Sequence, residues 1–157
     1  MNKSLPIVIT ILATTTALAV TSTHTKAAVR TSPVSLRGTW YHYFSGQWAA
    51  PDKPFVEKIT ITKHSMTSSY RGTHYRLKGK HFVVSAVKKP VQLKGHAKKM
   101  MTRYMLGDFG DLPMEISTHL TVAGKTRHVM LQNDQQNHMM IYTKFVPHKN
   151  YVIQAKW

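Results

Sequence analysis

The chain has 157 residues, no cysteine, and 22 Lys or Arg against six Asp or Glu, which gives a formal net charge of +16 at pH 7. The lack of cysteine excludes disulfide-stabilised scaffolds and thiol nucleophiles. The excess of positive charge favours anionic partners.

The N-terminal residues have the three-part pattern of a secretory signal peptide. Lys3 supplies a positive charge, residues 5–20 are uncharged, apolar and threonine-rich, and Thr25 and Ala27 place small residues where a signal peptidase cuts. The apolar stretch is short for a membrane-spanning helix, which needs about 20 mostly apolar residues. We predict a signal-peptide helix over residues 1–27 that is removed, and a secreted protein held at the cell surface, if at all, without a covalent anchor.

Residues 28–36 are a polar lead-in, and residues 37–157 are predicted to form a single β domain. Alternation of apolar and polar residues with period two dominates this part of the chain. It begins with Trp40, His42 and Phe44 on one face of a first strand. Residues 58–62 continue the pattern, with Ile59 and Ile61 on one face, and residues 65–70 predict a short edge strand.

A first hairpin is predicted over residues 73–86. With Gly79-Lys80 at its tip, Leu77 pairs with Phe82 and Tyr75 with Val84, so that all four apolar side chains share one face. A slip of one residue would move every side chain to the other face, so the alternation favours a two-residue turn. Glycine as the first central residue is typical of a type II′ turn.

The same argument predicts a second hairpin over residues 116–131. With Gly124-Lys125 at the tip, Leu120 pairs with Val129 and Thr118 with Leu131. Further strands are predicted at residues 100–106, 138–146 and 151–156. The fold class is therefore all-β, an antiparallel up-and-down barrel of about eight or nine strands or, as the alternative, a β-sandwich.

The opening strand, LRGTWYHY over residues 36–43, resembles two groups of proteins. Small secreted proteins of lactic acid bacteria often begin with a similar Gly-Thr-Trp-Tyr strand. Gly38 and Trp40 also resemble the Gly-x-Trp signature of lipocalins and other calycin barrels. This second resemblance implies a lipocalin-like barrel whose end is closed by Trp40 and whose interior binds a small apolar ligand. In lipocalins a late arginine packs over this Trp, whereas here only lysines follow Arg127, at positions 144, 149 and 156.

Positive charge is concentrated between residues 58 and 107, which contain 12 Lys or Arg and no acid. A field of one sign attracts polyanions. No nucleic-acid-binding motif is present, and a secreted protein would meet wall polymers or an acidic membrane surface rather than a genome. We predict polyanion binding through six clustered residues: Lys88, Lys89, Lys94, Lys98, Lys99 and Arg103.

The sequence offers no catalytic motif, and we expect neither enzymatic activity nor a cofactor. The densest acidic group, Asp108, Asp111 and Glu115, has the glycine and proline neighbours of a turn. Pairing of Leu131 with Met139 would align one sheet face of histidine, methionine and tyrosine side chains. That face is expected to be ordinary surface, although its ligand types also make a copper site a minor alternative: His119, His128, Met130, Met140 and Tyr142. We therefore predict a monomeric, non-enzymatic binding protein.

Overall fold

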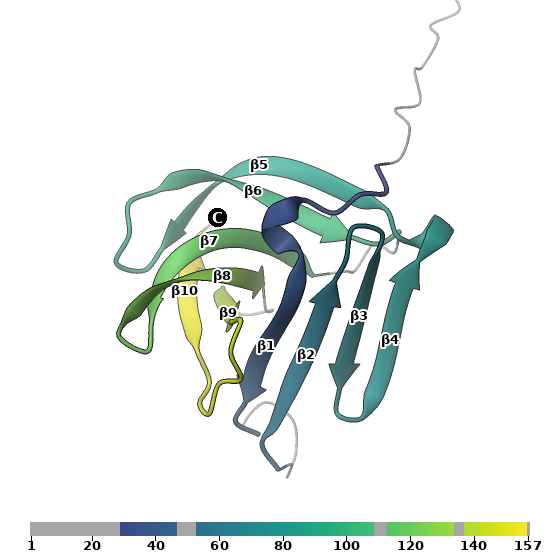
Figure 1. Cartoon of the computed structure of the whole chain (residues 1–157). Helices are drawn as coiled ribbons and strands as arrows, with labels where there is room; N and C mark the ends of the chain where they lie inside the picture. The colour runs from purple at the N-terminus through teal and green to yellow at the C-terminus, as the bar shows by residue number, and fades with distance from the viewer. Residues whose placement is uncertain (1–28, 47–52, 109–112, 134–136, 157) are drawn as a thin grey trace, which may run out of the picture.

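The computed structural model describes residues 29–46, 53–108, 113–133 and 137–156, so the predicted signal-peptide helix lies outside the described residues. The described part consists of ten antiparallel strands and two short 3-10 helices, arranged as a four-stranded sheet beside a closed barrel (Figure 1). Within these ranges, no helix is both long and apolar enough to cross a membrane.

The four-stranded sheet is a meander that follows the 3-10 helix η1 (Val34–Leu36). Its strands lie in chain order: β1 (Gly38–Phe44), β2 (Phe55–Ile61), β3 (Ser65–Tyr70) and β4 (Thr73–Lys78). Residues 65–70 were expected at a sheet edge, but β3 pairs with both β2 and β4. The outer strand is β4, which pairs with β3. The tight turn between these two strands contains Arg71 and Gly72, at φ 47° and 78°.

The barrel is closed by six strands in the order β10-β5-β6-β7-β8-β9. They are β5 (Val84–Leu93), β6 (Lys99–Leu106), β7 (Met114–Val122), β8 (Lys125–Asn133), β9 (His138–Tyr142) and β10 (Val152–Lys156). The prediction of an all-β antiparallel fold with a barrel is confirmed. The barrel has six strands instead of eight or nine, because β1–β4 form a sheet of their own.

The predicted first hairpin is wrong. β4 pairs with β3, and β5 enters the barrel after the 3-10 helix η2 (Gly79–His81). Gly79, at φ 59°, starts that helix instead of a two-residue turn. Leu77 and Phe82 are nevertheless both buried in one core cluster, which is why the apolar pattern suggested a direct pairing.

The second hairpin forms, but its turn lies one residue earlier than predicted. Ala123 and Gly124 occupy the turn with φ of 51° and 73°, and Leu120 pairs with Arg127 in place of Val129. Positive φ at both central residues is the type I′ geometry. The following pairing also differs, since Leu131 lies opposite Ile141 and not Met139. In both cases the pairing register differs from the predicted register by two residues, so the same side chains remain on each face of the sheet.

The barrel interior is filled by a hydrophobic cluster drawn from five of its strands. Apolar side chains pack there as a core, which gives the apolar-ligand hypothesis no support. The buried members are Val91, Leu93, Ile116, Leu120, Val122, Val129, Leu131, Met139, Ile141 and Ala155.

A second hydrophobic cluster lies between the four-stranded sheet and the outer face of the barrel. Trp40, Ile59 and Leu77 contribute from the sheet, while Met130 and Tyr142 contribute from the barrel. The sheet is also joined to the chain just after β9, because Tyr41 and Thr143 exchange two backbone hydrogen bonds of 2.8 and 2.9 Å. Trp40 was predicted to close a barrel end, whereas it lies in this second core.

Candidate functional site: a cationic surface with two polar pockets

The six predicted basic residues all lie on the β5–β6 hairpin. Five of them are exposed, and Arg103 is half-buried. Lys88 and Lys89 are on β5, Lys99 and Arg103 are on β6, and Lys94 and Lys98 flank the connecting loop.

These residues do not all point to one face of the hairpin. Lys88 pairs with Thr102, and Val87 pairs with Arg103. Because side chains alternate between faces along a strand, Lys88 projects opposite to Lys89 and Arg103. The hairpin therefore presents positive charge on both sides.

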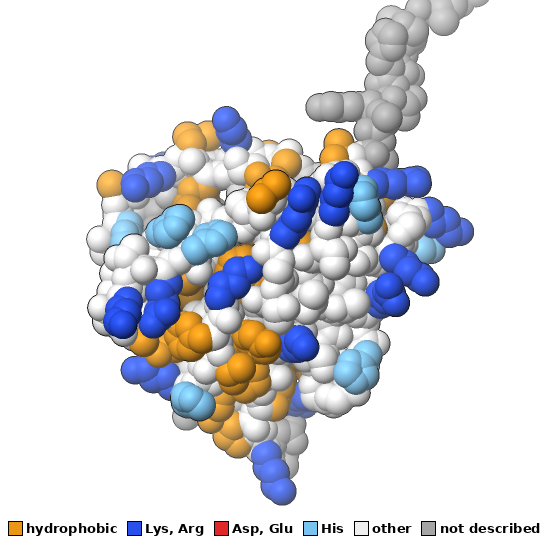
Figure 2. Space-filling model, viewed as in Figure 1, with side chains coloured by type: hydrophobic (Ala, Val, Ile, Leu, Met, Phe, Trp, Pro, Cys, Tyr) orange, Lys and Arg blue, Asp and Glu red, His pale blue; other side chains and the backbone are white. Residues whose placement is uncertain are grey.

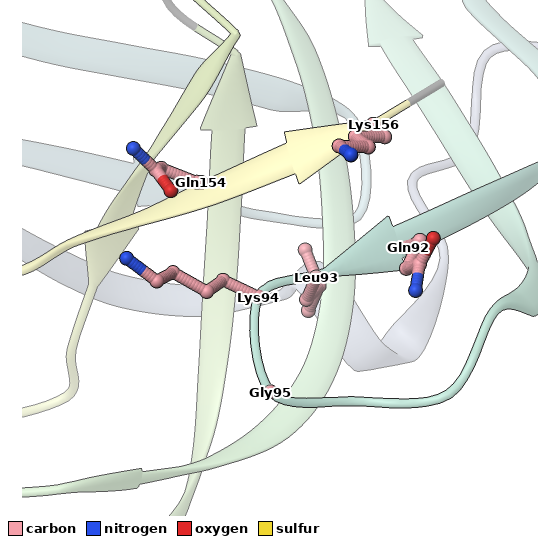
Figure 3. Close-up of a pocket in the computed structure, with 6 residues that line it drawn as sticks. All are labelled: Gln92, Leu93, Lys94, Gly95, Gln154 and Lys156. Carbon is pink, nitrogen blue, oxygen red and sulfur yellow. The ribbon is translucent and has the colours of Figure 1, made fainter.

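A polar pocket of about 250 Å³ lies at the seam where β5 and β10 close the barrel (Figure 3). Lys156 pairs with Gln92, and the backbone N–H of Lys94 donates a 2.9 Å hydrogen bond to the carbonyl of Gln154. The four side chains at this seam are exposed, and they offer two ammonium groups and two carboxamides. We call this the seam pocket; its lining is Gln92, Leu93, Lys94, Gly95, Gln154 and Lys156.

A second depression, of about 440 Å³, lies on the four-stranded sheet near its outer strand. Its basic members are Lys58 on β2 and His74 and Arg76 on β4. Hydroxyl groups and one more aromatic ring complete the lining: Thr60, Thr67, Ser68, Ser69 and Tyr75. Like the seam pocket, it is lined without a carboxylate.

Acidic side chains are nearly absent from the described surface. Of the three described acids, Glu57 and Glu115 are buried with exposed fractions of 8% and 2%. The third, Asp108, has its Oδ2 atom 2.9 Å from Nδ1 of His81. Figure 2 shows basic side chains spread over one face, with no acidic side chain in view among the described residues. The charged groups on the surface of the described residues are therefore almost all cationic.

Trp40 lies under a lysine ammonium group. Nζ of Lys144 is 3.4 Å from the centroid of the Trp40 ring and donates a 2.9 Å hydrogen bond to the carbonyl of Arg37. The indole N–H donates to the carbonyl of Leu36 at 2.7 Å. Lys144 thus covers Trp40, and partial burial lowers the pKa of its ammonium group.

The predicted His/Met/Tyr face is divided between surface and core. His119 and His128 lie opposite each other on β7 and β8, with ring centroids 5.2 Å apart. Met130 and Tyr142, in contrast, are fully buried beneath the four-stranded sheet. Among the described residues, no group of three or more His, Cys, Asp or Glu is placed to hold a metal ion.

A buried polar network lies in the core between the sheet and the barrel. The Tyr142 hydroxyl is 2.6 Å from Oε2 of Glu57 and 2.9 Å from Oε1 of Gln132, and the Ser68 hydroxyl donates to Oε1 of Glu57 at 2.6 Å. Gln132 also donates to Glu115 at 3.4 Å. The sequence did not reveal this network, since its members come from β2, β3, β7, β8 and β9.

Burial controls the ionisation of this network. It raises the pKa of Glu115 to about 8, with the hydrogen bond from Gln132 acting in the opposite direction. It also holds the pKa of Tyr142 well above its ordinary value, an effect that the neighbouring Glu57 increases. Of the three acids predicted to form a turn, Glu115 lies instead in strand β7, Asp108 follows β6, and Asp111 is outside the described residues.

Comparison of the chain with protein-family models, with curated proteins and with solved structures finds no match.

Proposed function

We propose that this is a secreted, non-enzymatic protein that binds anionic polymers of the cell envelope through its cationic surface. The observation that supports the proposal is the distribution of charge. The described residues include 20 Lys or Arg and only three acids, two of which are buried while the third contacts a histidine.

Polyanion binding matches this surface better than solubility alone does. Solubility is served equally well by mixed charges of both signs, whereas a field of one sign accelerates the encounter with a polyanion. The seam pocket adds donor groups that suit phosphate or carboxylate oxygens, because lysine ammonium groups and carboxamides all donate hydrogen bonds.

Retention on purified cell walls that carry anionic polymer tests the proposal. Binding should weaken steadily between about 50 and 500 mM salt, because each neutralised phosphate releases counterions. A variant with four hairpin lysines changed to Glu should bind with a weaker dependence on salt: Lys88, Lys89, Lys98 and Lys99. The magnitude of the slope of log affinity against log salt concentration should fall by about 3.

A matched variant separates the hairpin from net charge. Changing Lys53, Lys63, Lys125 and Lys149 to Glu removes the same charge from exposed positions elsewhere. The proposal predicts stronger retention for this variant than for the hairpin variant. Equal loss in both variants, or no retention of the unchanged protein at low salt, would refute binding through the hairpin.

A further inference from the structure

A group of one serine and two histidine side chains lies apart from the β5–β6 hairpin, on the outer face of β7 and β8. Oγ of Ser117 is 2.7 Å from Nε2 of His128, whose ring stacks on His119 and meets the edge of Trp40 at 5.3 Å. Figure 2 shows histidine side chains side by side over these two strands. His119 is exposed and His128 and Ser117 are half-buried, so solvent reaches the group.

We propose that Ser117, His119 and His128 form a proton-dependent binding site for a tetrahedral oxyanion of the phosphate class. The three side chains share one face of the β7–β8 hairpin and converge from neighbouring positions. Lys144, above Trp40, adds a fixed positive charge beside them. This site is separate from the lysines of the β5–β6 hairpin, and anion binding here does not require polymer binding there.

The hydrogen bond between Ser117 and His128 explains why anion binding should depend on protonation of His128. When His128 is neutral and Nε2 accepts, the serine hydroxyl spends its only proton on the ring. When His128 is protonated, Nε2 becomes the donor, and the hydroxyl can donate instead to the carbonyl of Ser35, 3.4 Å away, or to an anion. Protonation therefore adds a positive charge and releases the O–H from the ring, so that an anion competes only with the Ser35 carbonyl for this donor.

The surroundings of His128 provide positive charges to attract the anion. Partial burial lowers the pKa of His128, and the nearby His119 and Lys144 lower it further. His119 faces it from β7, Lys144 from the segment after β9, and the uncharged Trp40 from β1. An oxyanion would offset this mutual repulsion, so binding and protonation should favour each other.

Calorimetric titration with sulfate tests the coupling, since sulfate keeps its charge across the pH range used. At constant ionic strength, affinity should rise by up to about tenfold per pH unit as the pH falls from about 7.5 to 5.5. At about pH 6, inorganic phosphate and glycerol 3-phosphate should bind more tightly than dimethyl phosphate, because a diester presents fewer charged oxygens to charge-assisted donors.

Substitutions of single residues test which side chains cause the pH dependence of sulfate binding. His128→Gln should abolish the pH dependence, whereas His119→Gln should weaken binding because it removes one of the three side chains of the site. Ser117→Ala should weaken binding at low pH while leaving the fold intact by circular dichroism. His148→Gln, in the segment between β9 and β10, removes an exposed histidine elsewhere and should change nothing. Affinity that is independent of pH, or unchanged in the His119→Gln and His128→Gln double variant, would overturn the proposal. Retention of that double variant on cell walls at about pH 7.5 should be normal, so failure here and failure of polymer binding are distinguishable.

Discussion

Gly38 lies directly beneath the ammonium group of Lys144. A Cβ atom on Gly38 would be 2.6 Å from Nζ of Lys144, and the residue has a φ of +111°, which side chains of L-residues rarely adopt. The same lysine covers Trp40. The glycine of the Gly-x-Trp pair is thus needed for two independent reasons, its backbone conformation and the space for Lys144.

Gly38→Ala should therefore lower the free energy of unfolding by about 1–3 kcal/mol, through backbone strain and displacement of Lys144. Chemical denaturation measures the loss. Gly95→Ala is the control, since its φ is +79° but nothing lies within 4 Å of the added carbon. Equal losses would show that Lys144 is not displaced. The cost of Gly38→Ala should also be smaller in a Lys144→Ala background, because the crowded group is then absent.

Tyr142→Phe should destabilise the protein by about 1–3 kcal/mol, because Oε2 of Glu57 and Oε1 of Gln132 then lose the hydroxyl donor that lies between them, with no gain in packing. Thermal and urea denaturation both report this change. Tyr75→Phe, at a ring that is 40% exposed, should have little effect. A Tyr142→Phe variant as stable as the unchanged protein would contradict a stabilising role for the network.

Glu115 should make the protein less stable as the pH rises. Its pKa is about 8 when folded against an ordinary value of 4.5, so between these values the folded state binds more protons than the unfolded state. The contribution of Glu115 is complete below about pH 4.5 and is lost as the pH rises through about 8. Glu115→Gln, which is always neutral, should flatten the fall. An unchanged pH profile in the variant would show that another group causes it.

His42 should have the opposite dependence at the acid end. Burial lowers the pKa of its imidazole, although the hydrogen bond between Nδ1 and the carbonyl of Ile141 acts against the shift. The folded state therefore resists protonation, so stability holds above the ordinary value of 6.5 and falls as the pH drops below it. A proton titration of the His42 ring by NMR checks this directly, and a pKa at or above 6.5 would contradict it.

Ala123→Asn should raise the free energy of unfolding by about 0.5–1 kcal/mol, because asparagine tolerates the positive φ of a type I′ turn better than alanine does. The urea midpoint measures the gain. Thr121→Asn, in the flanking strand β7, serves as the control and should give no gain. A loss of stability in Ala123→Asn would mean that the turn has a different geometry.

The alternation of side chains predicts which residues are buried, but it does not specify their partners. Both registers of the β7–β8 hairpin place Leu120 and Leu131 in the barrel interior, since they differ by two residues. The correct turn requires Ala123 at positive φ, and alanine gives no sequence signal for that conformation. Leu77 and Phe82 share a core although Leu77 lies on β4 and Phe82 lies in the connection between η2 and β5.

The candidate site was predicted only in part. The charge pattern identifies Lys94, but the seam pocket also needs Lys156, which comes 62 residues later and joins only when the barrel closes. Similarly, the sequence did not indicate which of the lysines at positions 144, 149 and 156 would cover Trp40, and the structure shows that it is Lys144. Contacts between distant segments depend on topology, which local periodicity does not contain.

The β5–β6 hairpin is bound tightly within itself and loosely to its neighbours. Its two strands share eight residue pairs, but it meets β10 through two pairs and β7 through two pairs. Val91 and Leu93 of β5 also hold the hairpin in place, because they belong to the hydrophobic cluster of the barrel. The two edges of the hairpin, where few backbone pairs form, are therefore the places in the barrel where amide hydrogens should exchange with solvent fastest.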